Sequence, residues 1–276
     1  MNTAMQLPAL SLVDWCETRD TIHNYARVLG KIRATLTSPQ KHWWHVTLHV
    51  GIRGLTTTPM STSGKTCEVT LDFVHHQLVI ATSVGESVSI PLQGQCTDSL
   101  CRAALAAMAS MGIECNLDGT SFPKESVPTY DKAMIEHYWR AISWIDMIFK
   151  EFKGGLRGET SPVHLFAHHF DLTLNWFSGR LVPGADVTDE EASDENMGFG
   201  FVTGDASVPE AYFYATAYPT PPDFTGIPLP AGAYWHTAGW SGIALDYSDL
   251  IDSENARATL FTFLRSVQKA GARLME

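Results

Sequence analysis

Histidine is the residue type in this chain that most directly indicates chemistry. Eleven histidines occur in 276 residues, and eight of them fall in three clusters, at 42–49, 75–76 and 164–169. Imidazole titrates near neutral pH and is a common metal ligand, so these clusters are candidates for acid–base catalysis or metal binding. Which chemistry is open to them depends on the elements that carry them.

His45 and His49 have the spacing of two zinc ligands on one face of a helix, as in zinc proteases. Apolar and polar residues alternate over 44–53, however, and this pattern predicts a strand, on which the two imidazoles lie about 13 Å apart. No Glu stands between them to act as a base. A site therefore has to be assembled across strands, with His45 or His49 meeting His169 and Asp171, the carboxylate orienting an imidazole.

The same polar residues have a simpler interpretation, in which they form the solvent-facing side of antiparallel sheets. His75 and His76 stand beside a turn and are interpreted as surface residues. The chain has no G-x-S-x-G motif, no locally activated cysteine and no glycine-rich loop between a strand and a helix. Nucleotide cofactors are therefore disfavoured, and the sequence identifies neither a cofactor nor a metal.

The periodicity of apolar residues predicts an α+β fold with antiparallel β-sheets and packed helices. Short connections favour antiparallel pairing of neighbouring strands. The helices are expected at 14–36, 97–112, 130–153 and 253–274, the last with Asp252 or Ser253 as its cap, and the strands at 44–53, 67–74, 77–83, 87–92, 168–176, 197–203, 211–218, 233–237 and 241–246.

A linker at 113–128 divides the expected elements into two α+β halves, 1–118 and 119–276, which are expected to form one compact unit around a shared core. Both halves run from a helix through a glycine and basic segment and the dipeptide Ser-Pro to a strand that carries histidine. An internal duplication explains this order, and chance similarity is the alternative. A duplication predicts a cleft between the halves.

The charge and cysteine content limit the partners. Thirty acidic residues against nineteen basic ones give a formal net charge of −11, which repels phosphate backbones and anionic lipids. The sequence therefore predicts no nucleic-acid partner and no membrane partner, and the acid-rich segment 183–197 is expected to be an exposed loop. Five scattered cysteines and the lack of a long apolar run predict a cytoplasmic protein.

Several short motifs resemble a family of bacterial proteins of unknown function, over the full length of the chain. They include Lys31-Ile32-Arg33, His42-Trp43-Trp44, Arg53-Gly54-Leu55, Ser161-Pro162-Val163-His164, Phe170-Asp171-Leu172, Phe177-Ser178-Gly179-Arg180 and Phe213-Tyr214 to Tyr218-Pro219. The resemblance implies no known activity or ligand. His42, His164, Asp171, Arg53 and Arg180 match the family pattern, whereas His45 and His49 depart from it.

Three functions follow from these observations, and whether the protein is an enzyme stays open. The first is binding of a small, partly apolar and anionic ligand in an aromatic-lined cleft. Its candidate ligand-binding residues are Trp44, Arg53, Arg180, Tyr214 and Tyr218. The second is a metal-dependent or histidine-based hydrolase with His42, His164 and Asp171 as catalytic residues. The third is an interaction protein without a pocket.

Overall fold

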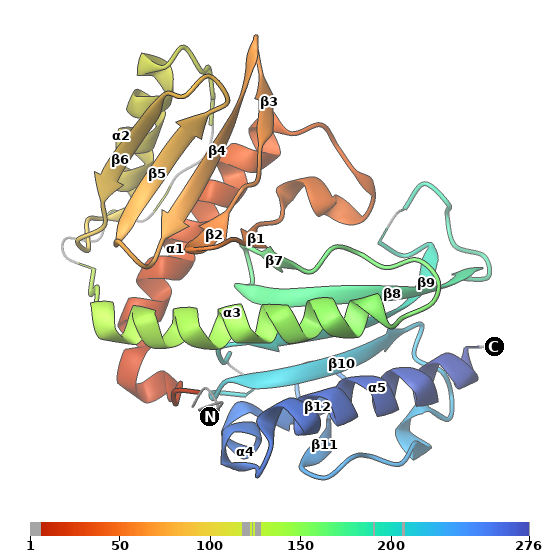
Figure 1. Ribbon diagram of the computed structural model, residues 1–276. Helices are drawn as coiled ribbons and strands as arrows, with labels where there is room; N and C mark the ends of the chain where they lie inside the picture. Colours follow the sequence, from red (N-terminus) through yellow and green to blue (C-terminus); the bar gives the residue numbers. More distant parts are fainter. Residues whose placement is uncertain are drawn as a thin grey trace. The chain divides into compact units, whose positions relative to one another are not determined.

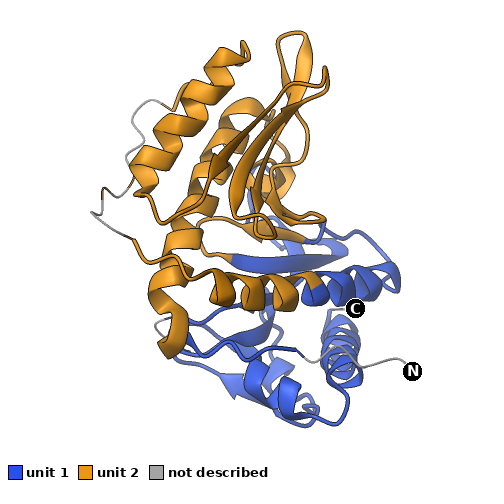
Figure 2. Cartoon of the chain, turned by 60° about the vertical axis from the view of Figure 1, so that its left-hand side comes forward, with its two compact units in different colours: residues 1–12, 144–163, 171–276 blue, residues 13–143, 164–170 orange. Residues whose placement is uncertain are grey.

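The computed structural model describes residues 7–117, 122, 124, 128–189, 191–205 and 208–275 (Figure 1). The chain divides into two compact units whose segments alternate along the sequence (Figure 2). Unit 1 comprises Met1–Leu12, Trp144–Val163 and Asp171–Glu276, and unit 2 comprises Val13–Ser143 and His164–Phe170. Each unit contains an antiparallel sheet and helices, which confirms the predicted α+β class.

Unit 2 is built on a sheet with the strand order β1-β2-β4-β5-β6, to which β3 adds by pairing with β4. Burial alternates along β5, and α2 packs on β5 and β6 through its apolar stripe. The elements are α1 (Leu12–Leu36), η1 (Lys41–Val46), β1 (His49–Val50), β2 (Gly54–Thr56), β3 (Met60–Thr62), β4 (Lys65–Asp72), β5 (Gln77–Thr82), β6 (Ser87–Pro91), α2 (Thr97–Ser110) and β7 (His164–Phe166).

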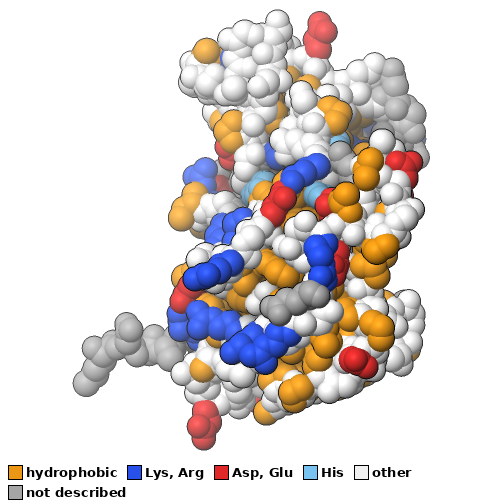
Figure 3. All heavy atoms as spheres, turned by 90° about the vertical axis from the view of Figure 1, so that its right-hand side faces the viewer, with side chains coloured by type: hydrophobic (Ala, Val, Ile, Leu, Met, Phe, Trp, Pro, Cys, Tyr) orange, Lys and Arg blue, Asp and Glu red, His pale blue; other side chains and the backbone are white. Residues whose placement is uncertain are grey.

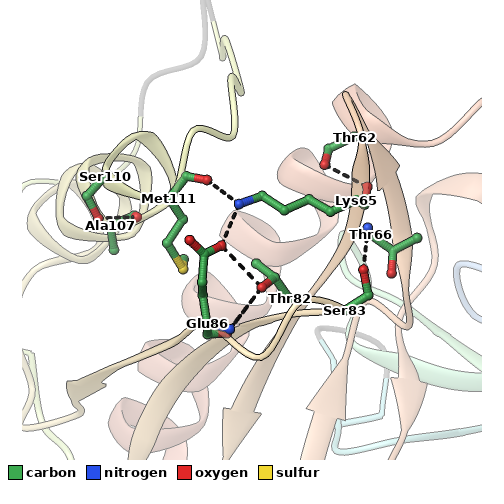
Figure 4. Close-up of polar contacts among 9 residues, drawn as sticks. All are labelled: Thr62, Lys65, Thr66, Thr82, Ser83, Glu86, Ala107, Ser110 and Met111. Carbon is green, nitrogen blue, oxygen red and sulfur yellow. Dashed lines mark hydrogen bonds and ion pairs between the residues drawn. The ribbon is translucent and has the colours of Figure 1, made fainter.

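A polar network fixes the end of α2 against this sheet (Figure 4). The Lys65 ammonium donates both to the Glu86 carboxylate and to the Met111 carbonyl, which follows the last turn of α2. Thr82 in turn donates to the same carboxylate. A lysine here suits the negative end of the helix dipole.

Unit 1 is built on a sheet with the strand order β11-β12-β10-β9-β8. Helix α5 packs on β9 and β10, and the C-terminal half of α3 belongs to the same unit. The elements are α3 (Lys132–Gly154), β8 (Asp171–Leu181), β9 (Asp194–Val202), β10 (Tyr212–Tyr218), η2 (Phe224–Gly226), β11 (Ala233–His236), β12 (Gly242–Asp246), α4 (Tyr247–Asp252) and α5 (Ala256–Leu274). Its apolar core contains Phe152, Phe199, Phe213, Leu260 and Phe263.

The strand predicted at 44–53 is wrong, and the reason is local. Residues 41–46 form a 3-10 segment, and β1 is limited to 49–50. Just before the predicted strand, His42 and Trp43 have φ of 52° and 59°, which extended backbone does not adopt, so no extended segment leads into Trp44. Thr47 Oγ1 also donates to the Trp44 carbonyl over 2.9 Å, a bond that competes with strand pairing.

Three smaller predictions also need correction. The strand expected at 168–176 begins at Asp171, so His168 and His169 lie in a turn. His76 is buried and lies 3.2 Å from the Tyr130 hydroxyl through Nδ1, so it is not a surface residue. The cap of α5 is Asn255, because α4 occupies the positions up to Asp252.

The boundary expected between residues 118 and 119 lies outside the described residues. The two halves, their shared core and the internal duplication therefore stay predictions. Among the helices that the structure describes, none has the length and apolar character that crossing a membrane requires.

Candidate functional site

The register of the unit 1 sheet aligns a row of residues on one face. Thr173 pairs with Gly200, Gly200 with Tyr214, Tyr214 with Ala244, and Ala244 with Tyr234. Directly paired residues of antiparallel strands share a face, so this row crosses four strand boundaries on the same side. We call the side that carries Tyr212, Tyr214, Tyr234, His236 and Trp240 the aromatic face.

Tyr214 reaches across β9 to the acidic residue at the start of β8. Its hydroxyl donates to Asp171 Oδ2 over 2.7 Å and lies 2.7 Å from Thr173 Oγ1. This reach depends on Gly200, because a Cβ there would lie 2.2 Å from Cζ of Tyr214. Asp171 is only 9% exposed, so its carboxylate depends on such donors for stability.

Two further tyrosines repeat the arrangement. The Tyr212 hydroxyl donates to Asp205 Oδ2 over 2.5 Å, and the Tyr234 hydroxyl donates to Asp246 Oδ1 over 2.8 Å. Tyr212 also pairs with Asp246 in the β10–β12 register. All three tyrosines of the aromatic face thus direct their protons at carboxylates.

The Trp240 ring contacts three other aromatic side chains of this face. Its ring lies 5.8 Å from Tyr212 at 9°, 4.5 Å from His236 at 29°, and meets Tyr214 edge-on at 6.1 Å. His236 is held by a contact of 2.7 Å between Nε2 and the Ala238 carbonyl. These contacts restrict the rings, and Tyr214, Tyr234 and Trp240 are partly exposed.

The electrostatics keep the tyrosines protonated. Burial, followed by the charge of Asp171, raises the pKa of Tyr214 well above its usual value. Burial and the hydrogen bond to Asp205 raise the pKa of Tyr212. Burial and the hydrogen bond to Asp246 raise the pKa of Tyr234 to about 12. These phenols are therefore not bases at neutral pH, and the face is suited to positioning a ligand.

Of the residues predicted for a site, unit 1 carries Asp171, Tyr214, Arg180 and Tyr218. The first two are brought together by the hydrogen bond across Gly200. Arg180 instead forms a bidentate ion pair with Glu195, with contacts of 3.0 and 3.1 Å. Tyr218 is 43% exposed at the end of β10.

Unit 2 carries His42, Trp44, Arg53 and His164. The His42 ring lies 5.4 Å from that of Trp44, and the His164 ring is fully buried, 6.5 Å from that of His49. The pairing of His42 with His164, and that of His164 with Asp171, stay predictions.

Arg53 binds a buried acid in unit 2. Its Nε lies 3.2 Å from Asp72 Oδ2, and the His75 ring lies 2.9 Å from the same oxygen. Burial raises the pKa of Asp72, but hydrogen bonds from His75 and the charge of Arg53 outweigh it, so that the pKa is lowered overall. An anionic ligand at Arg53 would have to compete with this carboxylate.

The third histidine cluster packs against α1. The rings of His168 and His169 lie 4.2 Å apart, and burial lowers the pKa of His168, helped by His169 and Lys31. In the part of the chain that the structure describes, no three His, Cys, Asp or Glu side chains are grouped so that they could hold a metal ion.

Of the residues that build the aromatic face, the sequence interpretation singled out Asp171 but gave no role to Gly200, Asp205 or Asp246. Gly198 and Gly200 alternate with Phe199 in a buried strand, a pattern typical of close approach by another group. Tyr-Phe-Tyr at 212–214 places two tyrosines on one side of a strand. Together these two patterns could have indicated a tyrosine lying over a glycine.

The comparisons with known proteins give a family and no activity. The chain matches the model of a family of unknown function, DUF5996, over residues 7–276. It belongs to that family. This confirms the resemblance to a family of unknown function. The comparisons of this DUF5996 chain with curated proteins and with solved structures found no match.

Proposed function

We propose that this DUF5996 protein binds a small, partly apolar ligand on the aromatic face of unit 1. The observation that carries the proposal is the hydrogen bond from Tyr214 to Asp171 across Gly200. A half-buried polar network of this kind has a high desolvation penalty unless its groups are fully satisfied. Apolar residues at these positions would avoid this penalty. The presence of the network therefore favours a role in ligand recognition.

The chemistry of the face indicates what such a ligand offers. Its apolar part stacks on the partly exposed rings of Tyr214, Tyr234 and Trp240. The Tyr234 proton is directed at Asp246, so the Tyr234 oxygen has acceptor positions left, whereas Thr173 already donates to the Tyr214 oxygen. The polar part of the ligand is then a hydrogen-bond donor, such as a hydroxyl or an ammonium group.

The negative charges of the aromatic face disfavour the anionic ligand that the sequence suggested. The carboxylates of Asp171, Asp205 and Asp246 repel an anion. Arg180 is the arginine that the sequence predicted for this unit, and it is paired with Glu195. We therefore expect a neutral or cationic ligand.

Saturation-transfer NMR with three matched probes tests the proposal. The probes are 2-phenylethanol, phenethylamine and phenylacetate, which share a ring and differ in the polar group. We expect transfer to the alcohol or the amine, weaker transfer to phenylacetate, and loss of transfer in Trp240→Phe. Trp43→Phe is the matched control, since Trp43 is 52% exposed in unit 2. Equal transfer in both variants, or to none of the probes, contradicts the proposal.

A histidine-based hydrolase is the second candidate, favoured by the approach of His49 to the buried His164 in unit 2. Neutral imidazoles can act as general bases near pH 7. Hydrolysis of p-nitrophenyl acetate should then fall more than tenfold in His49→Gln and stay unchanged in His137→Gln. An equal rate in the two variants removes this candidate.

A further inference from the structure

Helix α5 has a charge opposite to that of the rest of the chain. It contains four basic residues and no acidic one, although the formal net charge of the protein is −11. The four lie four residues apart along the helix, with Phe261 completing the series, and are all exposed: Arg257, Arg265, Lys269 and Arg273. The opposite side is buried in unit 1 through Leu260, Phe263, Leu264 and Val267. Figure 3 shows Lys and Arg side chains gathering on one face of the molecule.

Aromatic and ionic contacts organise the first part of this series. Arg257 Nη2 lies 2.5 and 2.6 Å from the two carboxylate oxygens of Glu151 in α3. The guanidinium groups of Arg257 and Arg265 lie 4.7 and 4.8 Å from the centre of the Phe261 ring. Arg257 is thus neutralised, whereas stacking fixes Arg265 without neutralising it.

Three cations are left to act together, and we call Arg265, Lys269 and Arg273 the basic stripe. No ion pair of theirs with a carboxylate is found among the residues that the structure describes. Successive members are separated by about 6 Å along the helix axis and by about 40° around it. Alternate residues of an extended peptide are separated by about 6.6 Å, so carboxylates at alternate positions match this spacing.

We propose that the basic stripe binds a short acidic segment of a partner protein in extended conformation. Two arginines suit carboxylates, which they bind bidentately. The stripe extends over only about 12 Å. A nucleic acid would continue past it over a strongly acidic protein, and three cations are fewer than the four to eight typical of lipid-binding clusters. The apolar side of α5 is buried and does not insert into a bilayer.

Fluorescence anisotropy of a labelled peptide with four aspartates at alternate positions tests this surface on the full-length protein. We expect binding that weakens as salt is added. The triple variant Arg265→Gln, Lys269→Gln and Arg273→Gln should bind about tenfold more weakly, because each exposed ion pair contributes a modest factor. The matched control removes three exposed cations of unit 2, through Lys31→Gln, Lys132→Gln and Arg140→Gln, and should bind as the wild type does.

Three outcomes overturn the proposal. The first is equal binding by the triple variant and its control, which have the same net charge. The second is equal binding of the peptide with asparagine in place of aspartate. The third is tighter, stripe-dependent binding of a 20-base-pair DNA duplex or of vesicles containing phosphatidylserine, which assigns the surface to nucleic acid or to membrane. Circular dichroism of the variants checks that all of them are folded.

Discussion

The sheets of the two units differ in how their faces are buried. In unit 2, β5 alternates between buried and partly exposed residues, and every second residue of β6 is exposed. In unit 1, β9 is buried at every position from Met197 to Val202. A sheet with one solvated face can carry polar residues at little cost, whereas polar groups between buried strands need partners. The Tyr–Asp pairs of unit 1 are therefore the polar features most in need of a functional explanation.

Replacing one glycine in each unit by alanine tests this comparison. The glycine in unit 2 is expected to give the larger loss of stability. A Cβ at Gly54 would lie 1.8 Å from the backbone oxygen of Leu71 in the neighbouring strand. Because backbone cannot move aside as a side chain can, Gly54→Ala should destabilise the protein by about 4 kcal/mol. Urea unfolding measures the effect. Gly226→Ala is the control, since nothing lies within 4 Å of a Cβ there.

In unit 1 the obstacle is a side chain. Gly200→Ala pushes the Tyr214 ring away from Asp171, and we expect a loss of about 3 kcal/mol from overpacking and the lost hydrogen bond. Urea unfolding again measures it. Ligand binding should be abolished as well, unlike in a variant that is destabilised equally elsewhere. Wild-type stability in Gly200→Ala contradicts the described position of Tyr214.

The hydroxyl of Tyr214 can be removed without changing the ring. Tyr214→Phe leaves the Asp171 carboxylate without this donor, and we expect a loss of about 2 kcal/mol because the bond involves a charged group. The control is Tyr218→Phe in the same strand, where the exposed ring predicts a change below about 0.5 kcal/mol. Equal effects in the two variants rule out a special role for the aromatic face.

The lowered pKa of His23 in unit 2 predicts how the stability of the protein depends on pH. Burial lowers the pKa of His23 to about 4, against the bonds that its ring makes to the carbonyls of His168 and Ala167. Between pH 6.5 and 4 the unfolded chain binds a proton that the folded chain does not, so stability falls as the pH is lowered. We expect the free energy of unfolding, measured by urea unfolding, to fall by about 2 kcal/mol less over this pH range in His23→Gln than in the wild type. In the control, His137→Gln, the fall should equal that of the wild type.

The sequence predicts most elements of the fold and only part of the site. Strands such as β4 and β5 follow from alternation, because one face is buried and the other is not. Residues 41–46 could not be predicted from alternation, because side-chain bonds to the local backbone decide their conformation. Asp171 and Tyr214 were singled out for separate roles, and their contact could not be foreseen because it depends on the register of three strands and on Gly200 between them.

The Trp240 indole N–H signal, identified by its absence in Trp240→Phe, tests the central claim most directly. Titration with phenethylamine or 2-phenylethanol should shift this signal in a saturable way and leave the signals of Trp43 and Trp44 in place. Shifts confined to Trp43 and Trp44 would move the binding site to the histidine cluster of unit 2. A Trp240 signal that never shifts contradicts ligand binding at the aromatic face.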